Sequence, residues 1–120
     1  MSLEERIGTV FTRVGLLITA ALHLLRPQIY DDITPDWVPA ARLVIYLSGA
    51  AEAATALGAL HPRTRQAARW LGIATMVGVF PSHVHMLQHA ERYPRIPRWA
   101  LWARLPLQGV FIRLIWTATR

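Results

Sequence analysis

The chain has 120 residues, of which 53% are hydrophobic and 17% charged, and its net charge of +6 includes 13 basic residues that are all arginine. This length suits one domain, and the apolar fraction exceeds what the core of so small a soluble domain can bury. The chain contains no cysteine, which excludes disulfides and thiol chemistry of its own. The arginines flank apolar segments and form no basic face, so we expect contact with lipid phosphates and no nucleic-acid binding.

The first apolar segment predicts a membrane-spanning helix over residues 7–25. It ends at Arg26 and Pro27 without a small-residue cleavage site, so we expect a retained helix and not a signal peptide. His23 lies near the far end of this helix. Two interpretations of His23 stay open, a neutral side chain hydrogen-bonded at the membrane interface or a member of a polar site.

A proline-containing connector follows over residues 26–40. Ile29, Tyr30 and Ile33 fit one face of a short helix lying at the surface, and Tyr30 and Trp37 suit the lipid headgroup level. The connector is either a simple anchored loop or a lid over the mouth of a helical bundle.

The second predicted helix covers residues 41–60 and contains a single carboxylate, Glu52. A charged group inside a membrane costs at least about 2.5–3.5 kcal/mol unless it finds a partner, a proton or water. The small residues Ser48 and Gly49 precede it and allow another helix to approach closely. We therefore expect this helix to hold an acidic group inside a bundle.

The third predicted helix covers residues 66–89, and the stretch from Trp70 to Ala90 contains no Asp, Glu, Lys or Arg. This is the clearest spanning signal in the chain. Pro81 should kink the helix and free a backbone carbonyl near Val77 for a neighbouring donor.

The fourth predicted helix covers residues 99–117 and begins with Trp99 and Trp102, which suit a membrane interface. Four spans place the N-terminus, the turn between helices two and three and the C-terminus on one side. That side carries the larger number of arginines, so both termini are predicted to be cytoplasmic.

Polar side chains from all four helices fall at similar depth, in the outer half of the predicted bundle. The candidate ligand-binding residues are His23, Ser48, Glu52, His83, Arg104 and Gln108. Residues four apart share a helix face, so we expect the Ser48 and Glu52 face to meet the Arg104 and Gln108 face, with Glu52 paired to Arg104. This layer is either a buried ion pair that sets helix register or a polar pocket for a small amphipathic ligand or a proton.

Metal binding is not predicted. His83 and His85 are two apart and would point to different sides of a helix, whereas His85 and His89 share a face but His89 lies at the water boundary. No phosphate-binding loop, nucleophile elbow or zinc-protease helix is present, and we predict no catalytic residue.

Several short motifs, taken in order, resemble the DoxX-like family of small bacterial four-helix membrane proteins. The likeness covers nearly the whole chain and is carried by His23-Leu-Leu-Arg26-Pro27, Pro35 and Pro39, Tyr46-Leu47-Ser48-Gly49 with Glu52, Pro62-Arg63-Thr64-Arg65, Phe80-Pro81 with Met86, and Trp102 with Arg104-Leu105-Pro106-Leu107-Gln108. This chain departs from the family pattern after Phe80-Pro81, where His83 and His85 stand in place of the usual Asn and Tyr.

The resemblance implies an all-α bundle of four transmembrane helices in the bacterial inner membrane, in a single domain over residues 1–120. It also implies an association with respiratory or redox chemistry. Without cysteine, electrons would travel on a bound cofactor, and a quinone is the expected one. We therefore expect a redox-associated membrane protein that binds a quinone or similar lipophile in its polar layer. The alternative is a non-catalytic scaffold, chaperone-like or lipid-binding protein. Membrane lipids are the expected partners, and a redox enzyme partner and a homo-oligomer stay open.

Overall fold

The structure, a computed structural model, describes residues 1–31 and 33–120. Helix makes up 77% of it and the described residues contain no strand, which confirms the all-α prediction. The elements in chain order are α1 (Leu3–Val10), the π-helical turn η1 (Phe11–Gly15), α2 (Leu16–Leu25), α3 (Gln28–Asp31), α4 (Ala41–Gly58), α5 (Arg65–Gly78), α6 (Phe80–Gln88), the 3₁₀ turn η2 (Ala90–Arg92) and α7 (Arg98–Ala118). They form four long helical segments, which agree with the four predicted helices to within four residues at each end.

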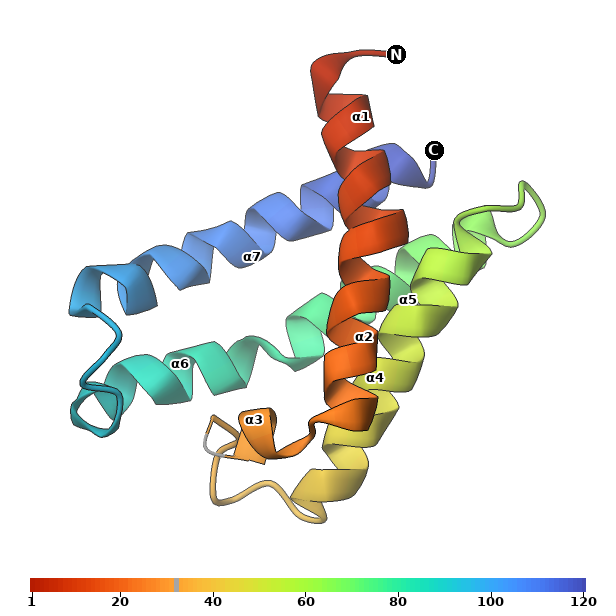
Figure 1. Ribbon diagram of the computed structural model, residues 1–120. Coiled ribbons are helices and arrows are strands. Elements are labelled where there is room, and N and C mark those ends of the chain that lie inside the picture. Colours follow the sequence, from red (N-terminus) through yellow and green to blue (C-terminus); the bar gives the residue numbers. More distant parts are fainter. Residues whose placement is uncertain (32) are drawn as a thin grey trace.

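The first segment, α1 to α2, is one continuous helix that begins four residues earlier than predicted (Figure 1). Ser2 explains the early start, because its side chain accepts a hydrogen bond from the backbone of Glu5 while Glu5 bonds back to the backbone of Ser2. This capping box satisfies backbone donors that would otherwise be unpaired. The π-helical turn in the middle shifts the faces that α1 and α2 present.

Glycines lie at the closest helix contacts. A methyl group added at Gly8 would meet the Thr117 hydroxyl at 2.4 Å, and one added at Gly49 would meet Cβ of His23 at 2.6 Å. At Gly72 it would meet the Thr55 side chain at 2.7 Å. These positions bring α1 onto α7, α4 onto α2 and α5 onto α4, as small residues do between membrane helices.

The third segment is broken between α5 and α6, as Pro81 predicts. Proline has no backbone N–H and interrupts the helical hydrogen bonds of the preceding turn. The side-chain amide of Gln108 donates to the carbonyl oxygen of Met76 at 2.7 Å. This bond reaches the carbonyl next to that of Val77, the one that Pro81 leaves without its helical donor.

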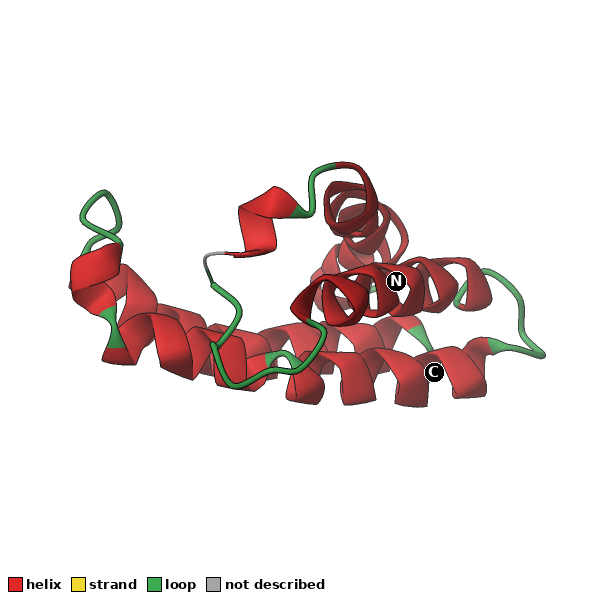
Figure 2. Ribbon diagram, turned by 90° about the horizontal axis from the view of Figure 1, so that it is seen from below, coloured by secondary structure: helices red, strands yellow, loops and turns green. Residues whose placement is uncertain are grey.

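The four long segments are arranged as two helix pairs. The structure pairs α2 with α4 and α6 with α7, and α1, α5 and the C-terminal half of α7 hold the two pairs together at one end (Figure 1). From there the two pairs diverge, and the connector containing α3 lies between them at the wide end (Figure 2). A small apolar core of Leu16, Ala56, Met76 and Ile115 sits at the narrow end.

Two helical segments of the described chain are long and apolar enough to cross a membrane. They are Leu3–Leu25, with 23 residues, and Arg65–Gln88, with 24 residues. The other two segments contain charged side chains, Arg42 and Glu52 in α4 and three arginines in α7. Their assignment as spans depends on where those charges lie.

Candidate functional site

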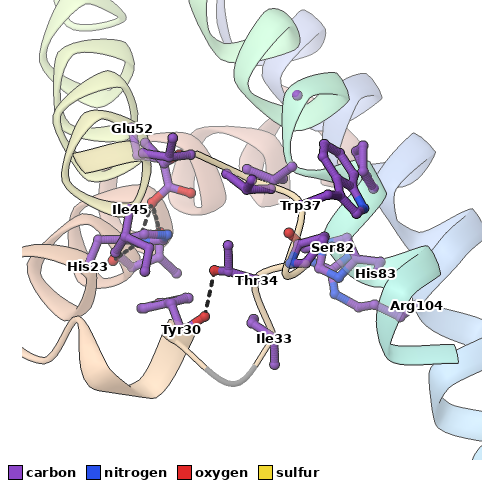
Figure 3. A pocket seen from close by; sticks show the side chains of 18 residues that line it. His23, Tyr30, Ile33, Thr34, Trp37, Ile45, Glu52, Ser82, His83 and Arg104 are labelled. Atoms are coloured by element: carbon purple, nitrogen blue, oxygen red, sulfur yellow. Dashed lines mark hydrogen bonds and ion pairs between the residues drawn. The ribbon is translucent and has the colours of Figure 1, made fainter. Parts of the chain in front are cut away.

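A cavity of about 380 Å³ lies between the two diverging helix pairs. One wall comes from α2 and α4 with His23 and Glu52, and the opposite wall comes from α6 and α7 with His83 and Arg104 (Figure 3). The connector closes the space between the walls. The divergence of the helix pairs thus creates the space in which the polar residues face each other.

Glu52 is the centre of the first wall and is only 6% exposed. Its carboxylate accepts a hydrogen bond from the Thr19 hydroxyl at 2.7 Å and lies 3.4 Å from Nδ1 of His23. Both neighbours come from α2, one helical turn apart. The carboxylate therefore has local polar partners, which lowers the cost of its burial.

The position of the proton on His23 follows from its contacts. Its Nδ1 lies 2.7 Å from the carbonyl oxygen of Thr19, and a carbonyl only accepts, so Nδ1 carries the proton. In the neutral ring, Nε2 is then a hydrogen-bond acceptor. The ring of Tyr30 stacks on His23 with centroids 3.8 Å apart and 15° between planes. Burial raises the pKa of the Tyr30 phenol, and the negative charge of Glu52 adds to this.

Thr19 can follow a change in the protonation of Glu52. Its hydroxyl lies 2.7 Å from Glu52 and 3.1 Å from the carbonyl oxygen of Leu16. A hydroxyl has one proton to donate and lone pairs to accept. It donates to the Glu52 carboxylate when that is ionised, and it donates to Leu16 while accepting from Glu52 when the carboxyl is protonated. The Thr19–Glu52 hydrogen bond can therefore persist in both protonation states of Glu52, whereas the bond to Leu16 forms only when the carboxyl is protonated.

The opposite wall is cationic. The Arg104 guanidinium donates from Nη1 to the Gln108 side-chain oxygen at 2.8 Å and lies 4.9 Å from the ring centre of Phe111. Both of these partners are uncharged. Within the described part of the chain, no carboxylate lies within ion-pair distance of Arg104.

His83 lies beside Arg104 on this wall (Figure 3). Both of its ring nitrogens are buried, and neither has a hydrogen-bond partner among the described residues. Buried polar atoms are normally satisfied, and each exception calls for an explanation. A cavity-lining imidazole without partners is the feature expected where a ligand or a water supplies the missing bonds.

The connector contributes mostly apolar side chains, including Ile33, Trp37 and Val38. Ion pairs hold it to both sides of the cavity. Asp31 lies 2.6 Å from Arg42 at the start of α4, and Asp36 lies 4.0 Å from Arg92 in η2. The connector is thus a wall of the cavity and is anchored by ion pairs on both sides of it.

Comparison with known protein families gives one result for this chain. A family described as "Domain of unknown function (DUF8561)" matches residues 13–119. The chain belongs to this family. No curated protein and no solved structure matches the chain.

The DUF8561 region contains all six predicted site residues, and the cavity brings five of them together. His23, Ser48, Glu52, His83 and Arg104 line it. Gln108 does not. It lies in a second, smaller cavity of about 240 Å³ and acts on the site through its bond to Arg104.

The expected ion pair between Glu52 and Arg104 is not formed. Glu52 accepts a hydrogen bond from Thr19 and lies 3.4 Å from Nδ1 of His23, whereas Arg104, on the opposite wall, donates to Gln108 of its own helix. The depth of the two residues along their helices was predicted adequately. The divergence of the helix pairs places the two residues on opposite walls. No pattern in the sequence predicted this divergence.

Thr19, Tyr30 and Trp37 were missed as site residues. Thr19 could have been found from the sequence, because it stands four residues before His23 and so shares its helix face.

For metal binding, the described residues contain no group of three or more His, Cys, Asp or Glu side chains that could hold an ion. The His85 and His89 rings instead contact each other, with centroids 4.3 Å apart.

Proposed function

We propose that this chain is a multi-pass protein of the bacterial inner membrane that binds a quinone or a similar lipophilic small molecule in the cavity between its helix pairs. The proposal includes four membrane spans with both termini in the cytoplasm, and a place for this DUF8561 chain among the DoxX-like proteins. It also includes a redox enzyme as the partner that would exchange electrons with the bound molecule.

The placement of the charges supports four spans. The two segments that fall short of a clear spanning signal do so because they contain charged residues. Glu52 in α4 is buried against α2, and Arg104 in α7 lines the cavity, so neither faces lipid. The others, Arg42, Arg98 and Arg113, lie near helix ends, where long side chains reach the interface.

The outer surface also supports a membrane setting. Large apolar side chains are more than a third exposed on all four long segments. Examples are Leu17, Ile18, Leu43, Leu47, Leu57, Trp70, Val77, Trp99, Trp102 and Val110. Soluble monomers rarely expose such extensive apolar surfaces.

The single observation that carries the ligand proposal is His83, a cavity-lining side chain whose two buried ring nitrogens lack partners among the described residues, with Arg104 beside it. The volume falls within the range of small-molecule sites, and a mainly apolar lining with a few converging polar groups is typical of them. A quinone carbonyl would accept hydrogen bonds from Arg104 and His83. The cluster of Glu52, Thr19 and His23 would face the opposite oxygen and exchange a proton with it.

The test is binding of a quinone to the protein purified in mild detergent. Decylubiquinone should raise the midpoint of thermal unfolding of the wild-type protein, and organic extracts of the protein should contain a co-purified lipophile. His83→Ala should remove most of the shift, whereas Arg98→Gln, at the exposed start of α7, should leave it unchanged. No shift with any quinone, together with lipophile-free extracts, would contradict the proposal.

The alternative is a non-catalytic scaffold or lipid-binding protein, and one observation favours it. The Glu52, Thr19 and His23 cluster is hydrogen-bonded without any ligand. A protein of this class would stay folded without the cavity being filled, and its thermal unfolding would not respond to quinones.

A further inference from the structure

The cavity contains a cation, Arg104, for which the described residues supply no counter-ion. An arginine side chain stays protonated in proteins, and a partly buried positive charge is stabilised only by an anion or by several acceptors. The described contacts of Arg104 are the neutral Gln108 amide and the face of Phe111. One of its five N–H groups is used by Gln108, so most of its donors are free to bind an oxygen.

Glu52 does not supply the missing charge. It is the carboxylate among the cavity-lining residues that the structure describes, and it belongs to the opposite wall (Figure 3). Its oxygen is already engaged by Thr19 and by His23. Moving it to Arg104 would break both interactions.

His83 adds a second donor at the same place. A neutral imidazole carries one N–H, and both ring nitrogens of His83 lack partners within the described residues. Two donors, one of them cationic, therefore lie side by side, and the described residues place no acceptor between them. An anionic oxygen is attracted to the Arg104 charge, whereas a ketone oxygen carries no net charge, so an anion fits this wall better.

Building on the proposed function, we infer that the ligand of the cavity is an amphipathic organic anion. Its negatively charged oxygen binds Arg104 and His83, and its apolar body packs against Ile33, Val38 and Ile45, which line the same cavity. Two kinds of molecule carry this chemistry. One is the ionised hydroxyl of a hydroxyquinone, and the other is the carboxylate of a medium-chain fatty acid.

The experiment compares matched anionic and neutral probes by isothermal titration of the full chain in a non-ionic detergent at mildly alkaline pH. Lawsone, a hydroxynaphthoquinone that is ionised under these conditions, is compared with neutral menadione. Decanoate is compared with decanol. The anionic member of at least one pair should bind roughly 10- to 100-fold more tightly, the difference expected for hydrogen bonds to a charged group. Preference within the first pair identifies a hydroxyquinone and preference within the second identifies a fatty acid.

Variants show whether Arg104 causes the preference. Arg104→Gln should bind the anionic and neutral members equally, and Arg104→Lys should keep part of the preference because it keeps the charge. Arg98→Gln removes the same charge outside the cavity and should behave as wild type. The thermal unfolding midpoint of each variant, measured without probe, confirms that it is folded.

Two outcomes separate this inference from the proposed function. If menadione and decanol both bind as tightly as their anionic counterparts, or if Arg104→Gln keeps the preference, the inference is overturned while the cavity remains a quinone or lipophile site. If none of the four probes binds and extracts contain no lipophile, the inference and the proposed function both fail.

Discussion

Glu52 is a carboxyl group in the middle of an apolar helix, and two side chains of the neighbouring helix stabilise it there. Thr19 donates a hydrogen bond at 2.7 Å, and His23 approaches to 3.4 Å. Arg104, the partner expected from the sequence, bonds instead to Gln108. The energetic consequence is that Glu52 and Arg104 behave as separate sites.

A double-mutant cycle tests this separation. Glu52→Gln and Arg104→Gln should have additive effects on the free energy of unfolding, with a coupling below about 0.5 kcal/mol, because the residues share no contact. Glu52→Gln with Thr19→Val should couple by about 0.5–1.5 kcal/mol, the net value of one buried hydrogen bond. The measurement is reversible unfolding in mixed micelles. Strong coupling of Glu52 with Arg104 would show that the two walls close together in solution.

Arg104→Gln should not destabilise the protein in the absence of ligand. The substitution removes a partly buried charge that lacks a carboxylate partner in the described chain, and burying an unpaired charge costs free energy. We expect an unfolding free energy equal to that of the wild type or higher by up to about 1 kcal/mol. A loss of several kcal/mol would mean that Arg104 has an anionic partner that stabilises the fold.

At the scale of elements, glycines decide how closely the helices approach. Gly49 places α4 directly against the backbone and side chains of α2, where added atoms would meet Cβ of His23 at 2.6 Å and the Ala20 carbonyl at 3.3 Å. This contact also holds Glu52 opposite Thr19, because Glu52 lies one turn further along α4. Packing of the helix pair and geometry of the acidic cluster are therefore linked.

The glycine contact predicts a large effect of a single methyl group. Gly49→Ala should destabilise the protein by about 1–3 kcal/mol, the usual cost of overpacking a close contact. Gly109→Ala in α7 is the matched control, because nothing lies within 4 Å of the added carbon. Its effect should stay within about 0.5 kcal/mol. Equal thermal unfolding midpoints for the two variants would contradict the close packing of α4 on α2.

At the scale of the whole molecule, the two ends of the helices differ. Both chain termini and the turn between α4 and α5 lie at one end, and the connector with α3 and the loop between α6 and α7 lie at the other (Figure 1). The end with the chain termini is the one that carries the larger number of arginines, and it is the end proposed to face the cytoplasm. This polarity makes the membrane topology testable.

Single cysteines introduced into this cysteine-free chain report the topology. Thr64→Cys, in the turn between α4 and α5, should react with a membrane-impermeant maleimide only from the cytoplasmic side. Pro94→Cys, in the loop between α6 and α7, should react from the outside. Ala56→Cys, at a position only 1% exposed, should react only after denaturation. Labelling of Thr64→Cys and Pro94→Cys from the same side would end the four-span proposal.

The sequence by itself determined the helices and the depth of the polar residues along them. Helix position follows from local properties, namely apolar runs, prolines and flanking arginines, and these are visible without a fold. For the same reason the break at Pro81 was predictable. The capping box at Ser2 and Glu5, which accounts for the longer first helix, was not predicted.

Only the tertiary structure decided which polar residues meet. Within the first pair, the close contact at Gly49 packs α4 on α2 and brings Glu52 to Thr19. The contacts at Gly8 and Gly72 join helices of different pairs, and such packing is a sum over many atoms that no local pattern encodes. The divergence of the pairs separates Glu52 from Arg104 and opens the cavity between them. A helix sequence gives the height of a side chain and its face, but the partner across the gap is set by the packing of the helices.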